Sequence, residues 1–168
     1  MQIEVSPIEL GQREILANLL EKYIYEFTQW NPREINALGL YGYRWLDSYW
    51  DPEEQNKRRW AYFIRADGQL AGFALVNDFP EIPDMPCDFS LAEFFVLHNH
   101  RRAGVGSAAA RAVFDLHRGR WQLKYHTKNT VSVEFWHKVV GAYTNGRFAL
   151  AHGTEDGPVW NVMCFENG

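Results

Sequence analysis

The stretch FFVLHNHRRAGVGS, residues 94–107, is the most informative part of this sequence. Its apolar start has the composition of a buried strand, and its end reads as the first turn of a helix. Amide groups at the start of a helix have no partner within the helix and carry a partial positive charge, so they bind anions such as phosphate. Gly104 and Gly106 allow close approach of the backbone, and Arg101 and Arg102 add charged donors. The stretch therefore predicts an anion-binding loop between a strand and a helix.

Two common phosphate-binding motifs do not fit this loop. A P-loop ends in Gly-Lys-Ser or Gly-Lys-Thr, which is absent here. A dinucleotide fingerprint is formally matched by Gly104, Gly106 and Ala109, but it requires glycines directly after the strand and an acid ~20 residues further on. Here about six residues separate the strand from the first glycine, and the next acids are Asp115 and Glu134. Both motifs are excluded.

On both sides of this loop the sequence alternates between strand and helix patterns. Asp67-Gly68 between two apolar runs predicts a tight hairpin. The order indicates a mixed α/β or α+β sheet. The expected elements are a short strand near Ile3–Val5, a helix over Leu16–Phe27, an irregular segment at 30–58, strands at 60–65, 70–76 and 89–97, a helix with the apolar face Ala108, Ala109, Ala112, Val113 and Leu116, a strand at 121–125, a helix at 129–140 that Gly141 ends, and strands at 147–151 and 159–165.

Composition excludes several classes of protein. The chain of 168 residues is 46% hydrophobic and 15% aromatic, which excludes a disordered chain. No apolar run approaches the ~20 residues that span a bilayer, and the first ten residues lack the pattern of a signal peptide. A net charge of −4 argues against a nucleic-acid partner. We therefore expect a single domain over residues 1–168, located in the cytoplasm and not bound to membrane.

The charged residues are unevenly distributed along the chain. Residues 1–100 hold 8 Lys and Arg against 16 Asp and Glu, whereas residues 101–168 hold 9 against 5. The split is consistent with two ligands of opposite charge, but an uneven solvated surface is the favoured interpretation without other evidence.

Cysteine and histidine give no sign of a metal site. Cys87 and Cys164 lack metal-ligand spacing, and no cluster of His, Cys, Asp or Glu has it either, so we predict no metal. Reduced thiols are the default for a cytoplasmic chain, with one disulfide left open.

The loop resembles the pyrophosphate-binding loop of the GNAT superfamily of acetyl-CoA-dependent N-acetyltransferases. The resemblance rests on Arg101-x-x-Gly104-x-Gly106 between a strand and a helix, and on Asn129 followed by the aromatic pair at 135–136, which is similar to the family's second motif. The order of elements also resembles that fold over essentially the whole chain. The resemblance implies a mixed, mostly antiparallel sheet flanked by helices and splayed between its two central strands at the cofactor.

The resemblance also implies an acetyl-CoA site with definite parts. Phe94, Phe95 and Val96 match the strand that pairs with the pantetheine arm, where a backbone N–H near Val96 would polarise the thioester carbonyl. Asn129 would contact the cofactor arm, cap its helix, or do both, and Trp136 would form a wall beside the sulfur. The pyrophosphate cradle corresponds to Arg102, Ala103, Gly104, Val105, Gly106 and Ser107, with Arg101 as a further donor.

The reaction implied is direct attack of an amine on the thioester. An alkyl amine has a pKa of ~10.4, so a base must remove a proton before attack. Glu93, just before the cofactor-pairing segment, is the candidate base, with a purely structural carboxylate as the alternative. The family often places another base on the next strand, where this chain has Lys124. Many members carry a tyrosine acid where this chain has Trp136, which leaves Tyr143 as the candidate acid.

The acceptor region implied by the resemblance is rich in aromatic and acidic residues. Residues 21–54 interleave tyrosines and tryptophans with Asp and Glu, which suits a cationic amine and also suits helices covering a core. We expect an N-acetyltransferase acting on a small-molecule or peptide amine, as a monomer or homodimer. The alternatives are a protein or peptide N-terminal acetyltransferase, and a non-catalytic acyl-CoA-binding regulatory module with the same fold.

Overall fold

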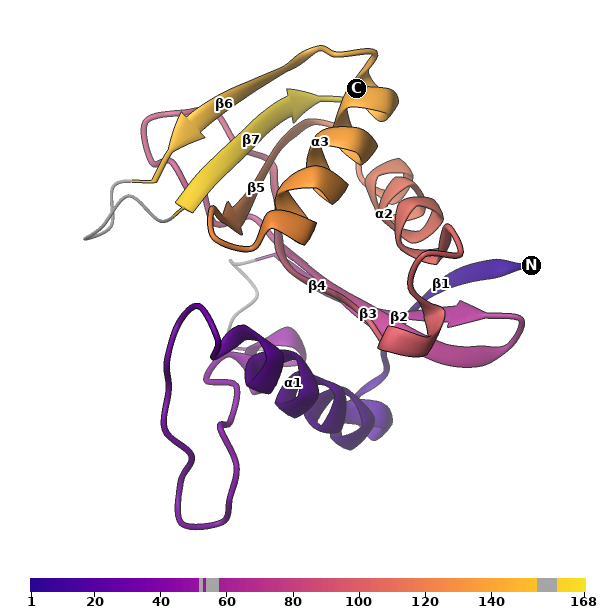
Figure 1. Cartoon of the computed structure of the whole chain (residues 1–168), viewed down its shortest axis with the longest axis vertical. Coiled ribbons are helices and arrows are strands. Elements are labelled where there is room, and N and C mark those ends of the chain that lie inside the picture. Colours follow the sequence, from indigo (N-terminus) through magenta and orange to yellow (C-terminus); the bar gives the residue numbers. More distant parts are fainter. Residues whose placement is uncertain (52, 54–57, 154–159) are drawn as a thin grey trace.

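The computed structural model describes residues 1–51, 53, 58–153 and 160–168, and over these ranges the elements follow the expected order (Figure 1). Short 3-10 turns accompany the main helices and strands. In chain order the elements are β1 (Ile3–Pro7), η1 (Leu10–Gln12), α1 (Arg13–Phe27), η2 (Leu46–Tyr49), β2 (Arg59–Ala66), β3 (Gln69–Asn77), β4 (Phe89–Val96), η4 (His98–His100), α2 (Val105–Leu116), β5 (Arg120–His126), α3 (Thr130–Thr144), β6 (Phe148–His152) and β7 (Trp160–Glu166).

The described strands form one seven-stranded sheet in the order β1-β2-β3-β4-β5-β7-β6. Neighbouring strands are antiparallel except for β4 and β5, which are parallel. Their pairing covers only the three residue pairs from Phe89–Trp121 to Leu91–Leu123, although β4 continues to Val96 and β5 to His126. The two central strands therefore diverge, and the predicted splayed, mostly antiparallel sheet is confirmed.

The hairpin predicted from Asp67-Gly68 joins β2 to β3. Both residues have positive φ, 48° at Asp67 and 79° at Gly68. A two-residue turn of this kind matches the twist of the flanking strands, and Asp-Gly tolerates it because glycine has no Cβ. The prediction is confirmed.

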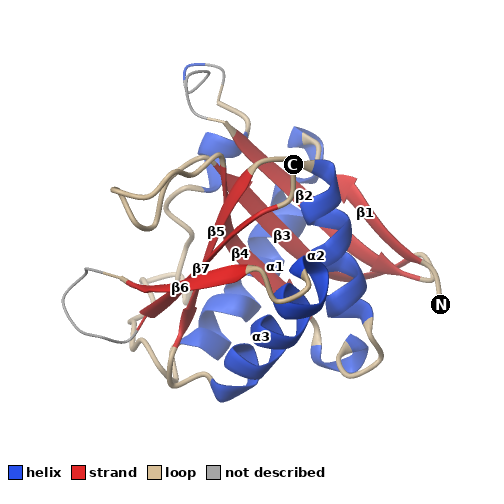
Figure 2. Cartoon of the chain, turned by 90° about the horizontal axis from the view of Figure 1, so that it is seen from above, coloured by secondary structure: helices blue, strands red, loops and turns tan. Residues whose placement is uncertain are grey.

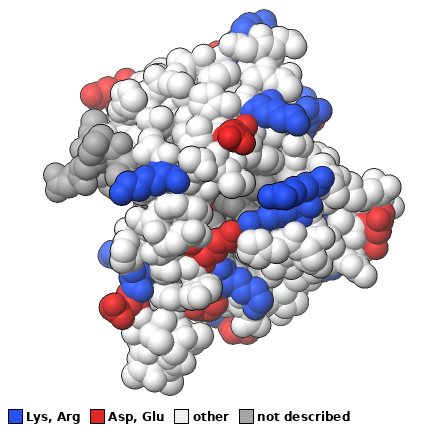
Figure 3. Space-filling model, viewed as in Figure 1, with Lys and Arg blue, Asp and Glu red and all other residues white. Residues whose placement is uncertain are grey.

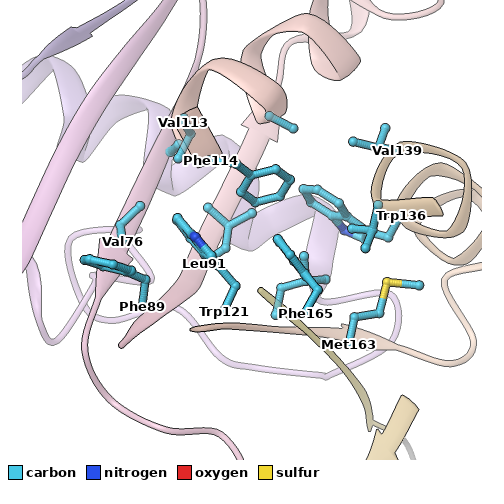
Figure 4. Packing of buried hydrophobic residues seen from close by; sticks show 14 of the residues in the cluster. Val76, Phe89, Leu91, Val113, Phe114, Trp121, Trp136, Val139, Met163 and Phe165 are labelled. Carbon is cyan, nitrogen blue, oxygen red and sulfur yellow. The ribbon is translucent and has the colours of Figure 1, made fainter. Parts of the chain in front are cut away.

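Helices cover both faces of the sheet (Figure 2). On one face α1 packs Leu16 and Leu20 against Phe63 and Phe73 of β2 and β3. On the other face α2 and α3 pack against β4, β5 and β7, and Figure 4 shows side chains from both helices, including Phe114 of α2, meeting those of the strands. The two cores lie on opposite faces of the sheet, and β4 contributes to both.

The buried face of α2 is confirmed in part. Ala109 and Val113 are buried as expected and Ala112 is half-buried, but Ala108 is exposed and Leu116 is 54% exposed, whereas Phe114, which was not predicted, is fully buried. The ring centroids of Phe114 and Trp121 lie 5.0 Å apart in an edge-to-face arrangement. In an alanine-rich helix the one large ring decides which face is buried, because it removes far more apolar area from water than any alanine does.

Helix α3 extends beyond its predicted end. It continues through Gly141 to Thr144 and stops at Asn145, which adopts the left-handed conformation with φ 53°. Thr144 is buried and its hydroxyl donates to the Val140 carbonyl at 2.8 Å. Burial of this last turn offsets the ~1 kcal/mol that an internal glycine costs a helix.

The cysteines are not joined to each other. Cys87 and Cys164 are both free thiols. In the described part of the chain, no group of three or more His, Cys, Asp or Glu side chains is arranged to hold a metal ion. No helix within these same ranges is long and apolar enough to cross a membrane.

Candidate active site

The divergence of β4 and β5 opens a cavity of about 260 Å³, which we call the slot. On the α1 side it is lined by Tyr23 and Phe27, and on the α3 side by Asn129, Ser132 and Trp136. Figure 3 shows a hollow in the middle of this face, with Lys and Arg side chains on both sides of it. The slot is therefore lined by elements from both faces of the sheet.

A β-bulge places Glu93 in the slot. Leu75 of β3 pairs with Glu93 but Val76 pairs with Leu91, so Ala92 is an extra residue in β4. Side chains of a regular strand alternate, so Glu93 would otherwise share the face of Leu91, which packs with α2 and α3. The bulge reverses the alternation, and Glu93 points toward α1.

Two tyrosines hydrogen-bond the Glu93 carboxylate. The Tyr23 hydroxyl donates to Oε2 at 2.5 Å and the Tyr43 hydroxyl donates to Oε1 at 3.2 Å. Burial raises the pKa of Glu93 above its ordinary value, while these two hydrogen bonds and the positive charge of Lys124 act in the opposite direction. A carboxylate with a raised pKa that lines a cavity has the properties of a general base.

Tyr43 is held in place by two side chains that fix its own segment. Glu21 of α1 accepts hydrogen bonds from the backbone N–H groups of Tyr41 at 2.9 Å and Gly42 at 2.8 Å. Arg33 donates to the carbonyl oxygens of Tyr41 at 3.0 Å and Gly42 at 2.8 Å. The segment between α1 and η2 is thus an ordered wall of the slot.

The acids of the first part of the chain do not gather in the slot. Glu26 forms a bidentate pair with Arg101, both contacts at 2.8 Å, and Asp47 pairs with Arg13. Among the described residues that line the slot, Glu93 is the only acid. Glu21, Glu26 and Asp47 therefore bind other parts of the same chain and do not line the slot, so these three carboxylates give no support to an acidic acceptor site.

The predicted anion-binding loop leads into α2. Gly104 has φ 83° and Arg102 has φ 63°, so the loop turns through two left-handed residues before the helix starts. A Cβ at Gly106 would lie 3.1 Å from the Phe135 ring and 3.7 Å from the Val96 side chain. Gly104 is thus required by backbone conformation and Gly106 by close packing of α2 against α3.

The two arginines of the loop differ in their surroundings. The Arg101 Nε donates to the Val96 carbonyl at 2.7 Å, its guanidinium pairs with Glu26, and it lies 5.5 Å from the centre of the Phe95 ring. Arg101 therefore joins the loop to β4 and α1. Arg102 is exposed, so of the two it is the one placed to meet a ligand.

The free edge of β4 presents backbone groups to the slot. The Phe95 carbonyl faces Gly72 of β3, and the Leu97 N–H donates to β3 at 2.8 Å. Backbone groups of successive residues in a strand point to opposite edges, so the N–H groups of Phe94 and Val96 point away from β3, and Phe94 also lines the slot. This is where the resemblance places the pantetheine arm.

The start of α3 forms the opposite wall. Asn129 caps the helix, its Oδ1 accepting from the Ser132 N–H at 3.1 Å, and both residues line the slot. The predicted cap is therefore confirmed, and the contact of Asn129 with the cofactor arm stays a prediction. Trp136 is buried and meets the Phe94 ring edge-on at 5.2 Å.

Tyr143 does not reach the slot. Its hydroxyl donates to Asp115 at 2.7 Å and accepts from the Asn167 side chain at 3.1 Å. Because α3 continues past Gly141, Tyr143 stays on the helix instead of folding back. Tyr143 is absent from the described lining of the slot, so it is not placed to act as the general acid there.

No sequence pattern predicts the β7 side of the slot. Trp160 stacks on Phe27 with centroids 5.6 Å apart, and Lys124 lies 5.2 Å from the Trp160 ring while pairing with Glu81 at 3.1 Å. His126 is buried there, which lowers its pKa and favours the neutral ring. The sequence pattern that bears on this wall is the helical spacing of Tyr23 and Phe27, which puts both side chains on one face of α1 and so places Phe27 beside Tyr23.

Comparison with known proteins identifies the family. The family model described as the Acetyltransferase (GNAT) family matches residues 20–142. The chain belongs to the GNAT acetyltransferases. A search of curated proteins found no match.

Solved structures share the GNAT fold with this chain over its whole length. An acetyltransferase from Thermus thermophilus is 16% identical, with a TM-score of 0.65, covering 99% of this chain and 98% of its own. The PaiA N-acetyltransferase from Thermoplasma acidophilum, solved with coenzyme A, is 14% identical, with a TM-score of 0.62 and coverage of 99% and 100%. A ribosomal-protein alanine N-acetyltransferase from Escherichia coli is 14% identical, with a TM-score of 0.61 and coverage of 98% and 94%.

Proposed function

We propose that this GNAT protein transfers the acetyl group of acetyl-CoA to an amine by direct attack within the slot. The observation that carries the proposal is the slot itself, which is lined from both faces of the sheet and contains one carboxylate, Glu93, next to the free edge of β4. A donor entering from the α2 and α3 side and an acceptor entering from the α1 side would meet at this carboxylate.

The residues on the α2 and α3 side fit acetyl-CoA. The N–H groups of Phe94 and Val96, on the edge of β4 that points away from β3, suit the amides of the pantetheine arm and the thioester oxygen. The start of α2 offers unpaired amides for the pyrophosphate, with Gly104 giving the turn and Arg102 a charged donor. Trp136 and Phe94 form an aromatic wall where the sulfur would lie.

On the α1 side Glu93 would take a proton from the ammonium group of the acceptor. The amine nitrogen then bonds to the carbonyl carbon and gives up a second proton to water, the carbon–sulfur bond breaks, and CoA leaves as a thiolate that takes a proton from water. Trp136 cannot supply this proton, because an indole N–H donates a hydrogen bond but is no acid near neutral pH. The acceptor class is a small-molecule or peptide amine.

The test is release of free CoA from acetyl-CoA in the presence of spermidine, L-lysine and an alanine-initiated peptide. Wild-type protein should release CoA together with N-acetylated product for at least one amine. Glu93→Gln should lower kcat ~100-fold or more and leave KM for acetyl-CoA unchanged, because it removes only the base. Glu134→Gln, an exposed change on α3, is the matched control and should keep wild-type kcat.

The alternative is a non-catalytic acyl-CoA-binding module. A rise in melting temperature with acetyl-CoA, combined with no turnover on any of these amines, would favour that module. Wild-type kcat in the Glu93→Gln variant would instead remove Glu93 from the chemistry.

A further inference from the structure

The hydrogen bonds to Glu93 come from two separate elements. Tyr23 belongs to α1, and Tyr43 belongs to the segment that Glu21 and Arg33 fix, yet each donates to a different oxygen of the same carboxylate. Two tyrosines that only filled space would not need their hydroxyls at this place. The arrangement is a clamp with one donor for each oxygen.

We propose that Tyr23 and Tyr43 are positioning residues that orient the Glu93 carboxylate toward the slot and keep it ionised, and so ready to accept a proton, at neutral pH. The inference rests on the proposed role of Glu93 as base. An ionised carboxylate has about four acceptor sites, so two donors leave the others for the substrate. The hydroxyls thus hold Glu93 without blocking it.

The clamp is needed because of where Glu93 lies. Burial disfavours the charged carboxylate and favours its neutral, protonated form, which cannot take a proton from an amine. Hydrogen bonds from neutral donors stabilise the charged form without adding a positive charge that would repel a cationic acceptor. Several titratable or charged groups lie around Glu93. They are Tyr23 on α1, Tyr43 on the segment that follows α1, Tyr49 at the end of η2, Glu81 before β4, Lys124 and His126 on β5, and Arg33, which also lines the slot.

The sign of the effect follows from these contacts. Removing either hydroxyl withdraws a hydrogen bond that is stronger to the carboxylate than to the neutral acid, so Glu93 should hold its proton to higher pH. Loss of one charge-assisted hydrogen bond should raise the titration midpoint of Glu93 by about one pH unit. Phenylalanine at the same position keeps the ring, so the contact of the Tyr23 ring with Phe73 is preserved.

The experiment titrates Glu93 directly in the protein without substrates. Protein labelled with ¹³C-carboxyl glutamate is followed by NMR from pH 4 to 9, and Glu93→Gln assigns the Glu93 signal. Tyr23→Phe and Tyr43→Phe should each raise the titration midpoint of Glu93 by about one unit. Tyr25→Phe, on the same helix but 70% exposed, is the matched control and should leave the midpoint unchanged.

A kinetic arm uses whichever of the three amines the wild type acetylates. In a plot of kcat against pH, the acidic limb should move to higher pH in Tyr23→Phe and Tyr43→Phe. Activity should recover at high pH, and KM for acetyl-CoA should be unchanged. Unchanged midpoints in both variants, or an equal shift in Tyr25→Phe, would overturn the inference. Shifted midpoints in a protein that acetylates no amine would support the clamp and reject the proposed function, so the two failures are distinct.

Discussion

Gly106→Ala offers a quantitative test of how α2 is seated against α3. The added methyl group would lie 3.1 Å and 3.2 Å from two carbons of the Phe135 ring, whereas carbon atoms in good contact are ~3.5–4.0 Å apart. Overpacking of this kind costs ~1–3 kcal/mol, and alanine in place of glycine returns ~0.5–1 kcal/mol of helix propensity. We expect a net loss of about 1 kcal/mol, which lowers the melting temperature by ~2–4 °C in a chain of this size.

A second substitution separates packing from ligand contact. Phe135→Leu removes the ring that the methyl group meets, so in this background Gly106→Ala should stabilise the protein by ~0.5–1 kcal/mol. The four proteins of this cycle are compared by thermal unfolding, and their affinity for CoA by calorimetry. Gly106→Ala alone should weaken CoA binding by displacing Phe135, and the double variant should bind CoA as Phe135→Leu does.

The reasoning would be refuted by additive stabilities across the cycle. It would equally be refuted if the double variant still bound CoA much more weakly than Phe135→Leu. Either result would mean that the methyl group at position 106 acts on the phosphate itself or on the backbone, and not through the Phe135 ring.

Two further predictions concern single residues. Trp136→Phe should keep kcat within ~tenfold of wild type with CoA binding intact, because the aromatic wall is preserved; a loss of several orders of magnitude in steady-state kinetics would assign Trp136 a chemical role. Burial lowers the pKa of His117, whose Nε2 lies 2.8 Å from the Tyr62 hydroxyl, so the unfolded chain binds the proton more readily and stability should fall as pH drops below ~6.5. The pH dependence of the melting temperature between 5 and 7 should be shallower in His117→Gln, and an unchanged slope would contradict this.

Local sequence patterns predicted the elements of the fold well. The Asp67-Gly68 turn, the apolar run of β4 and the helical spacing in α1 each act over a few residues, so they are visible in the sequence. The loop with Gly104 and Gly106 was predictable for the same reason, because its pattern lies within a few consecutive residues. Prediction was weaker where a contact between residues far apart in sequence determines the local structure. In α2 the Phe114 ring affects which face is buried more than the alanines do. In α3 the burial of Thr144 outweighs the tendency of Gly141 to end the helix.

The candidate site was predictable only in part for the same reason. Glu93 was found from its place beside the apolar run, but the bulge at Ala92 that turns it toward α1 depends on the register with β3. Tyr23 and Tyr43 lie far from Glu93 in sequence, and nothing local indicates that their hydroxyls converge on it. The ion pair between Arg101 and Glu26 was likewise not predictable, because the sequence around Arg101 indicates only an anion-binding loop.

The short pairing of β4 with β5 divides the sheet into two leaves joined along a narrow hinge. One leaf consists of β1 to β4 and the other of β5 to β7, and beside the hinge the rings of Phe89 and Trp121 meet at 5.4 Å. A change in a lining side chain alters the slot at one point, whereas a change in the packing of these two rings alters the angle between the leaves and so the width of the whole slot. In the proposed function, the packing of Phe89 against Trp121 would therefore affect which acyl groups fit, together with the residues that would touch them.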